Sequence, residues 1–213
     1  MVHLAKIMTG KFIVFEGIDG SGTTTQSNLL KKYLLEQGKN AILTAETTEG
    51  EIGKLLRKAL QNDIFFLDNE RRYDQQMALL FAADRHYHIF NQTDGILKSL
   101  KEGYYVIATR YYFSSIAYNA SNTEDFNWIS QLNSNFPQPD ILIYIDVPVD
   151  FSLERISKRK SLEIYEKREK LLNVSSNYLE LLKNYNGLLI NIDGKESIEK
   201  AHINIVKYLE KII

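Results

Sequence analysis

Three glycines and a run of hydroxyl side chains follow an apolar segment near the start of the chain. The apolar segment is residues 12–15, and from Gly17 to Thr25 the sequence reads GIDGSGTTT. Glycines allow a turn to take backbone conformations closed to other residues, and they leave room for a bulky anion against the main chain. If a helix begins after the turn, its first N–H groups and the positive end of its dipole face the same anion. The spacing therefore indicates a loop that binds the phosphates of a nucleotide.

This loop lacks one residue of the usual phosphate-loop pattern. The pattern is G-x-x-x-x-G-K-[ST], and Thr23 stands where the lysine is expected. Thr24 occupies the position whose hydroxyl ligates Mg²⁺, and we expect the Asp19 carboxylate to face the same cavity. Read alone, the segment is also compatible with a glycine turn in which Asp19 bonds its own backbone, although the pattern favours phosphate binding. The predicted phosphate-binding residues of the loop are Gly17, Ile18, Asp19, Gly20, Ser21, Gly22, Thr23, Thr24 and Thr25.

Apolar segments of strand length alternate with segments of helical periodicity along the whole chain. The predicted strands are residues 12–15, 40–44, 104–108, 140–147 and 188–192. The predicted helices are 24–37, 52–60, 68–100 (two helices meeting near 91–95), 114–119, 151–159, 164–183 and 198–213. Such alternation is typical of an α/β fold with a parallel sheet and helices on both faces. No repeat or linker divides the chain, so we predict a single domain over residues 1–213.

The composition narrows the classes of function. The 213 residues carry a net charge of −1 and include no cysteine, which excludes disulfides and thiolate chemistry. A balanced charge argues against a nucleic-acid-binding surface, and no uncharged run is long enough to cross a membrane. The start of the chain has too short an apolar run for a signal peptide, so we expect a cytoplasmic protein.

Four segments, taken together and in order, resemble the thymidylate kinases, a family of nucleoside-monophosphate kinases. They are residues 15–26, residues 79–85 (LLFAADR), Arg110-Tyr111 with Ser114, Ala117 and Tyr118, and residues 139–156. The resemblance implies a three-layer α/β/α phosphate-loop kinase fold with a five-stranded parallel sheet and a short lid at about 155–166. It also implies phosphorylation of dTMP to dTDP with ATP and Mg²⁺, by a homodimer.

The resemblance further assigns an acceptor site. Phe81 would stack on the thymine ring, and Arg85, four residues later on the same helix face, would bond its carbonyl edge. Arg110 would clamp the acceptor phosphate, and Tyr118 would crowd the position of a 2′-hydroxyl. Without the resemblance, Phe81 and Arg85 would be a core aromatic beside a surface arginine. The implied dTMP-binding residues are Phe81, Arg85, Arg110, Tyr111, Ser114, Tyr118 and Asn119.

A cluster of basic residues occupies the position of the family's lid. It comprises Arg155, Lys158, Arg159 and Lys160; alone, such a cluster is as typical of a solvated helix end. Because the loop has no lysine, we expect the lid to supply the cation that neutralises the transferring phosphoryl group. The implied catalytic residues are Asp19, Arg110 and Arg159, with Thr24 as the metal ligand. By resemblance, the turn at residues 193–195 would contact the adenine.

Two further positions depart from the family pattern. Ala45 stands where an arginine usually grips the acceptor phosphate, and Thr109 replaces an aspartate that normally lies near the metal. With Thr23, these changes keep two alternatives open. One is a kinase for another deoxynucleotide or a deoxynucleoside, and the other is a nucleotide-binding relative with little turnover.

Overall fold

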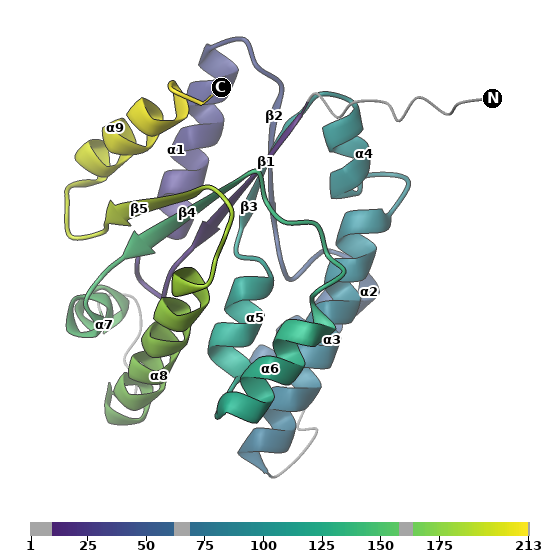
Figure 1. The fold of residues 1–213 in the computed structure, drawn as a ribbon, viewed down its shortest axis with the longest axis vertical. Coiled ribbons are helices and arrows are strands. Elements are labelled where there is room, and N and C mark those ends of the chain that lie inside the picture. The colour runs from purple at the N-terminus through teal and green to yellow at the C-terminus, as the bar shows by residue number, and fades with distance from the viewer. Residues whose placement is uncertain (1–9, 62–68, 158–163, 213) are drawn as a thin grey trace.

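The computed structural model describes residues 10–61, 69–157 and 164–212. Its centre is a parallel sheet with the strand order β2-β3-β1-β4-β5 (Figure 1). The strands are β1 (Lys11–Glu16), β2 (Ala41–Ala45), β3 (Tyr105–Thr109), β4 (Ile141–Asp146) and β5 (Leu189–Asp193). The helices are α1 (Thr23–Glu36), α2 (Glu51–Leu60), α3 (Glu70–Phe90), α4 (Ile96–Lys101), α5 (Tyr112–Asn119), α6 (Thr123–Leu132), α7 (Val149–Ser157), α8 (Ile164–Lys183) and α9 (Ile198–Leu209).

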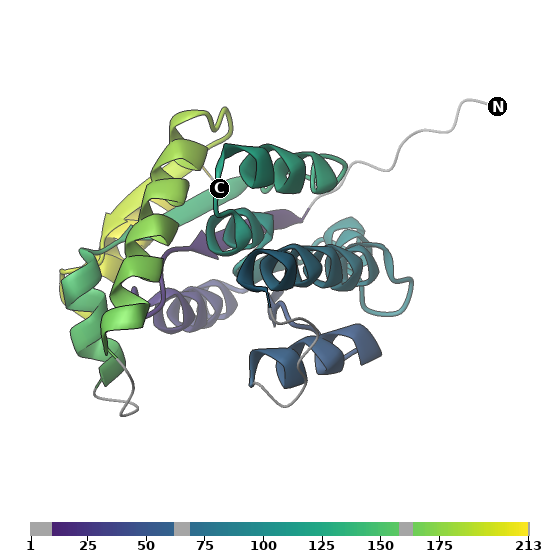
Figure 2. The same ribbon diagram turned by 90° about the horizontal axis from the view of Figure 1, so that it is seen from below.

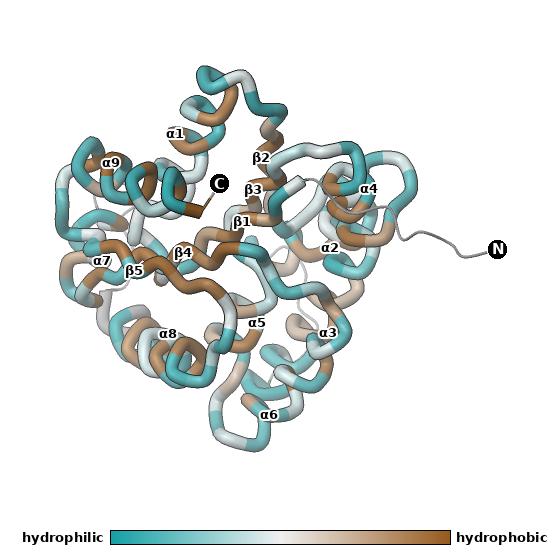
Figure 3. The backbone as a smooth tube through the Cα atoms, turned by 45° about the horizontal axis from the view of Figure 1, so that its top comes forward, coloured by the Kyte–Doolittle hydropathy of each residue, from teal (hydrophilic) through white to brown (hydrophobic). Residues whose placement is uncertain are grey.

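The sheet lies between two layers of helices (Figures 1 and 2). In β1, Ile13 and Phe15 belong to the core that includes α1 and α9, whereas Phe12 and Val14 belong to the core that includes α5 and α8. A strand covered on both faces needs apolar side chains at every position, which explains the continuous apolar run in the sequence. Figure 3 shows the same apolar runs meeting in the middle of the molecule.

The α/β prediction is confirmed, and all five strands lie where the sequence indicated, with shifts of a residue or so at their ends. The segment 68–100 is two helices, since α3 ends at Phe90 and α4 begins at Ile96. Two predictions were wrong: α6 was not expected, and the last helix ends at Leu209 rather than 213. Of the expected lid, residues 158–163 lie outside the part of the chain that the structure describes.

The carboxyl ends of the three central strands meet at one edge of the sheet. Phe15 of β1 lies opposite Thr109 of β3 and Ile143 of β4. The phosphate loop follows β1 and Arg110 follows β3, so the topology brings both to the edge where open α/β sheets bind ligands. Among the helices described, none is long and apolar enough to span a membrane.

Candidate active site

The phosphate loop uses glycine where its backbone requires it. Gly22 has φ 106°, in the left-handed region, directly before the first residue of α1. Gly20 has φ 79°, and a Cβ there would lie 2.9 Å from the carbonyl oxygen of Ser152. Side chains other than glycine are strained in that region. The loop therefore turns tightly into α1, whose N-terminus faces the edge of the sheet.

Thr23 and Thr24 are the first two residues of α1. Thr23 is buried, whereas Thr24 is exposed. Thr109 lies beside this first turn, with its Oγ1 3.0 Å from Ser27 Oγ, so a hydroxyl pair replaces the family's aspartate there. No group of three or more His, Cys, Asp or Glu side chains that could hold a metal occurs in the described ranges. Thr24, exposed at the start of α1, carries the hydroxyl that the motif assigns to Mg²⁺.

A cavity of about 1200 Å³ opens beside the loop. Every side chain that the resemblance assigned to dTMP lines it, together with Asp19. These residues come from α3, from α5 and from the turn between β3 and α5. The fold thus brings together residues that the sequence spreads over about a hundred positions.

Arg110 is the centre of a polar cluster in this cavity. Its Nη2 lies 2.6 Å from Asp19 Oδ1 and donates to the Tyr118 hydroxyl at 3.3 Å, while its Nη1 donates to Ser114 Oγ at 3.0 Å. The Asp19 N–H donates to the same tyrosine oxygen at 2.9 Å. Burial raises the pKa of Tyr118 to about 12, so its hydroxyl is neutral at physiological pH and accepts both bonds as an uncharged group. The cluster joins the phosphate loop to α5 and holds a fixed positive charge between them.

Arg85 is buried in the wall of the cavity. Its Nη1 donates to Asn133 at 2.5 Å, and its Nη2 donates to Glu46 at 2.5 Å and to Ser115 at 2.9 Å. Its Nε is buried and has no hydrogen-bond partner among the residues described. A buried donor without an acceptor is costly, so the Arg85 guanidinium still has an N–H to offer to an acceptor.

Asn119 also has a defined orientation. Its Nδ2 donates to the Ser115 carbonyl oxygen at 2.8 Å, which leaves Oδ1 as the atom that can face a ligand. The residue is buried and lines the cavity. Arg85 and Asn119 therefore offer one hydrogen-bond donor and one acceptor in the same space.

Sequence reasoning missed the residues that hold Arg85. Asn133 is buried and the side chain of Glu46 is 3% exposed, and Glu46 Oε1 also lies 3.5 Å from His88 Nδ1. The signal was present for Glu46, because it directly follows Ala45, a position already singled out. The sequence pattern drew attention to the arginine that Ala45 replaces, whereas Glu46 next to it is the residue that contacts Arg85.

The basic cluster at the expected lid position is only partly described. The Arg155 guanidinium donates to the carbonyl oxygens of Gly20 at 3.2 Å, Ser21 at 3.3 Å and Gly194 at 2.9 Å. All these acceptors are main-chain atoms, so direct phosphate binding by Arg155 stays a prediction. Lys158, Arg159 and Lys160 lie outside the described residues.

The arginines near the Ala45 substitution do not line the cavity. Arg57 donates to Thr47, Thr48 and Glu49. Arg71 is bound to Asp125 in α6. Neither replaces the arginine that Ala45 lacks.

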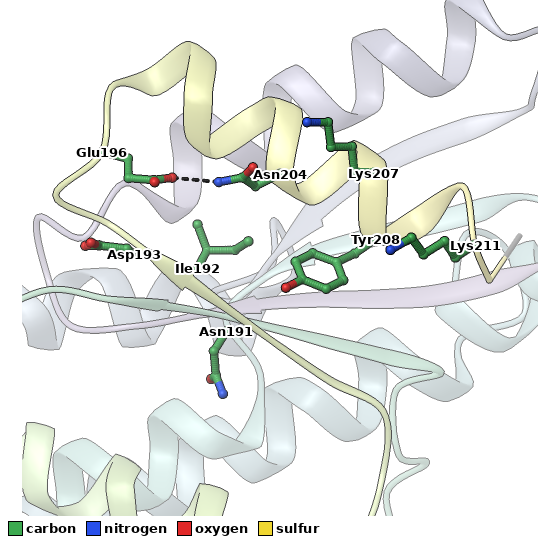
Figure 4. A pocket seen from close by; sticks show the side chains of 8 residues that line it. All are labelled: Asn191, Ile192, Asp193, Glu196, Asn204, Lys207, Tyr208 and Lys211. Carbon is green, nitrogen blue, oxygen red and sulfur yellow. Dashed lines mark hydrogen bonds between the residues drawn. The ribbon is translucent and has the colours of Figure 1, made fainter.

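A second, smaller hollow of about 330 Å³ lies between β5 and α9 (Figure 4). Figure 4 shows the side chain of Asn204 bonded to Glu196, at 2.7 Å, on one side of it. Asp193, expected near the adenine, lines this hollow, but no residue of the phosphate loop does. The hollow is therefore separate from the large cavity.

Comparison with known proteins agrees with this arrangement. A family model described as thymidylate kinase matches residues 15–205. A probable thymidylate kinase of Pyrococcus horikoshii is 42% identical, over 93% of this chain and 95% of its own length. Similar proteins from Methanococcus aeolicus, called a probable thymidylate kinase, and Saccharolobus solfataricus, called probable thymidylate kinase 1, are 40% and 39% identical. The matches cover 95% and 94% of this chain, and 98% and 97% of theirs. The family match covers the phosphate loop and also helices α3 and α5, which line the large cavity. The chain belongs to the thymidylate kinase family.

Proposed function

We propose that this protein transfers the γ-phosphoryl group of ATP to dTMP, giving dTDP and ADP. The observation that carries the proposal is that Arg85, with an unpartnered N–H, and Asn119, with its Oδ1 left over, line one cavity. A thymine base presents a carbonyl acceptor at C4 beside the N3–H donor, which matches one donor and one acceptor. Phe81 in the same cavity supplies an apolar face for the ring.

The remaining residues then have roles in positioning and charge. Arg110 would bind the acceptor phosphate, for which a planar guanidinium is suited. Asp19 would orient Arg110 and the acceptor. The N–H groups of the phosphate loop would hold the donor's β-phosphate. The attacking phosphate oxygen is already anionic at neutral pH, so no protein base is required.

The donor end of the site would hold Mg²⁺ through Thr24 and the donor's own phosphates. When bound, the ion would neutralise charge on the β- and γ-phosphates. Thr109, which pairs with Ser27, replaces the family's carboxylate near this position. Basic residues of the lid would supply the positive charge that the loop lacks, since Thr23 stands in place of the lysine.

Base selectivity tests the proposal. In a coupled assay of ADP release, we expect kcat/KM for dCMP to be at least about 10³-fold below that for dTMP, because a site built to hydrogen-bond a base rejects an analogue that cannot pair. Cytosine places a donor at C4 and an acceptor at N3, the reverse of thymine. ADP release without an acceptor gives the background. A preference for thymidine over dTMP would favour a deoxynucleoside kinase, and no turnover with any acceptor would favour the nucleotide-binding alternative.

We further propose a homodimer formed through α3. Leu79, Tyr87 and Phe90 are 49%, 50% and 43% exposed, and their spacing of eight and three residues places them on one side of the helix.

The net charge of −1 fits nucleotides rather than nucleic acids as partners. A cytoplasmic location stays a prediction.

The mass in solution tests the dimer. We expect wild type to elute with twice the chain mass in size-exclusion chromatography with light scattering, and Tyr87→Glu to elute as a monomer, because a charge cannot be buried unpaired in an apolar interface. Leu179→Glu on α8 is the control, since Leu179 is 59% exposed on another helix. A monomeric wild type, or equal dissociation by both variants, would contradict the proposal.

A further inference from the structure

Glu16 is a buried acid with no assigned role. It is the last residue of β1, directly before Gly17 of the phosphate loop, and its exposed fraction is 0%. Its Oε1 accepts from the N–H of Tyr111 at 2.7 Å and from the N–H of Ser114 at 3.3 Å. Tyr111 precedes α5 and makes no side-chain cap of its own. Glu16 therefore caps α5 from a strand about a hundred residues earlier.

The second carboxylate oxygen of Glu16 reaches the side chains around Arg110. Oε2 accepts from Ser114 Oγ at 2.6 Å and from the Tyr178 hydroxyl of α8 at 2.7 Å. Ser114 Oγ in turn accepts from Arg110 Nη1 at 3.0 Å. One hydroxyl thus separates the carboxylate from the guanidinium of Arg110. Burial raises the pKa of Glu16, while the charge of Arg110 opposes that shift.

Arg110 itself has an unusual backbone conformation. Its φ is 71°, the one positive φ among the described residues other than glycine, and such a conformation needs support from its surroundings. Two bonds provide it. The Arg110 N–H donates to the Phe15 carbonyl oxygen at 2.9 Å, and the next N–H, of Tyr111, donates to Glu16. The end of β1 therefore holds the chain at Arg110 and directly after it.

We propose that Glu16 is a positioning residue for Arg110. Through Tyr111 it fixes the backbone that presents the arginine, and through Ser114 it orients the guanidinium. Through Tyr178 it connects both to α8, the helix that follows the lid. The role in catalysis rests on the proposed function, in which Arg110 binds the acceptor phosphate; the structural role does not.

The variant Glu16→Gln tests the role with little change in shape. An amide has one acceptor and one donor end. If its oxygen caps α5, its NH₂ faces Ser114 and Tyr178, and if it turns, the NH₂ faces two N–H groups. In the first orientation the Ser114 and Tyr178 hydroxyls must accept instead of donate, and in the second the two N–H contacts are lost. We expect KM for dTMP to rise about tenfold, the loss of one hydrogen bond to a charged group, and KM for ATP to stay within about twofold.

Two tyrosine variants give a matched comparison. Tyr178→Phe removes one donor to Glu16 and should raise KM for dTMP in the same direction by a smaller factor. Tyr144→Phe is the control, because Tyr144 is buried with its ring centroid 5.4 Å from that of Tyr178 but makes no hydrogen bond to Glu16 or Ser114 in the part of the chain described. Equal changes in both variants would overturn the proposal, and Tyr178→Phe keeps it testable if Glu16→Gln does not fold.

A double-mutant cycle separates positioning from general stability. If Glu16 acts through Arg110, Glu16→Gln should change KM for dTMP by less than about twofold in an Arg110→Ala background. The same factor in both backgrounds, or an equal rise in KM for ATP, would overturn the proposal. A crystal structure of Glu16→Gln without ligand should show Arg110 displaced, and an unmoved Arg110 would also overturn it. Absence of dTMP turnover in wild type would refute the proposed function alone, because the crystallographic test does not depend on it.

Discussion

Arg159→Ala is expected to lower kcat by about 10²–10³-fold, which corresponds to roughly 3–4 kcal/mol of transition-state stabilisation. Catalysis of phosphoryl transfer relies on positioning and on neutralising charge at the transferring group. The loop contributes Thr23 in place of a lysine, and Arg155 is bonded to three main-chain carbonyls. We therefore propose Lys158, Arg159 and Lys160, the basic residues at the expected lid position, as the source of the missing charge.

The same substitution in a Thr23→Lys background distinguishes this explanation from a general role of Arg159. A lysine restored to the loop would share the neutralisation, so the loss from Arg159→Ala should shrink to about tenfold or less. The measurement is kcat at saturating ATP and dTMP for the four proteins of the cycle. Lys39→Ala is the control, because Lys39 is exposed just before β2, at the opposite edge of the sheet. If Arg159→Ala and Lys158→Ala each leave kcat unchanged, the lid does not replace the lysine.

The second large effect is expected at Arg110. Arg110→Ala should lower kcat/KM for dTMP by about 10³-fold, since it removes a fixed, paired charge from the cavity. Arg110→Lys should recover about tenfold of that loss, because an ammonium keeps the charge but not the planar pair of donors. Initial rates across a range of dTMP concentrations at fixed ATP give both values.

Arg72→Ala is the control for this series, as its side chain is exposed on α3. KM for ATP should change little in Arg110→Ala, because Arg110 lines the cavity with the residues assigned to dTMP. An equal loss toward ATP and dTMP would instead place Arg110 at the donor phosphates.

Most of the fold was predictable because its strands are buried on both faces. Such strands read as short apolar runs bounded by glycine, proline or charged residues, and the break between α3 and α4 is marked by residues 91–95. Helix α6 was missed because it buries only Asp125 and Ile129, too few positions for an apolar period. The start of α6 did carry a sequence signal, because an asparagine, Asn122, is followed by two acidic residues, as at many helix N-termini. In the structure Asn122 caps the helix by accepting from the Asp125 N–H.

The side chains of the site were predictable, but their partners were not. Arg85 is bonded to Glu46 and Asn133, which are 39 and 48 residues away. No local pattern connects residues at such separations, because the contacts exist only once the sheet has assembled. Glu16 was part of a recognised motif, yet its burial and its contact with α8 follow from packing alone.

Arg155 shows the same limit, because the sequence near a helix end does not reveal whether an arginine binds a phosphate or a main-chain carbonyl. The position of Arg155 also changes the electrostatics of the phosphate loop. A carbonyl that accepts a bond from a charged donor polarises its peptide group, and the N–H at the other end becomes a stronger donor. The Ser21 carbonyl belongs to the peptide whose N–H is that of Gly22, and this N–H finds no acceptor in the described part of the chain. The guanidinium thus acts as a positive charge behind the loop, and the peptide group carries its effect to the side where we expect the donor phosphate to bind.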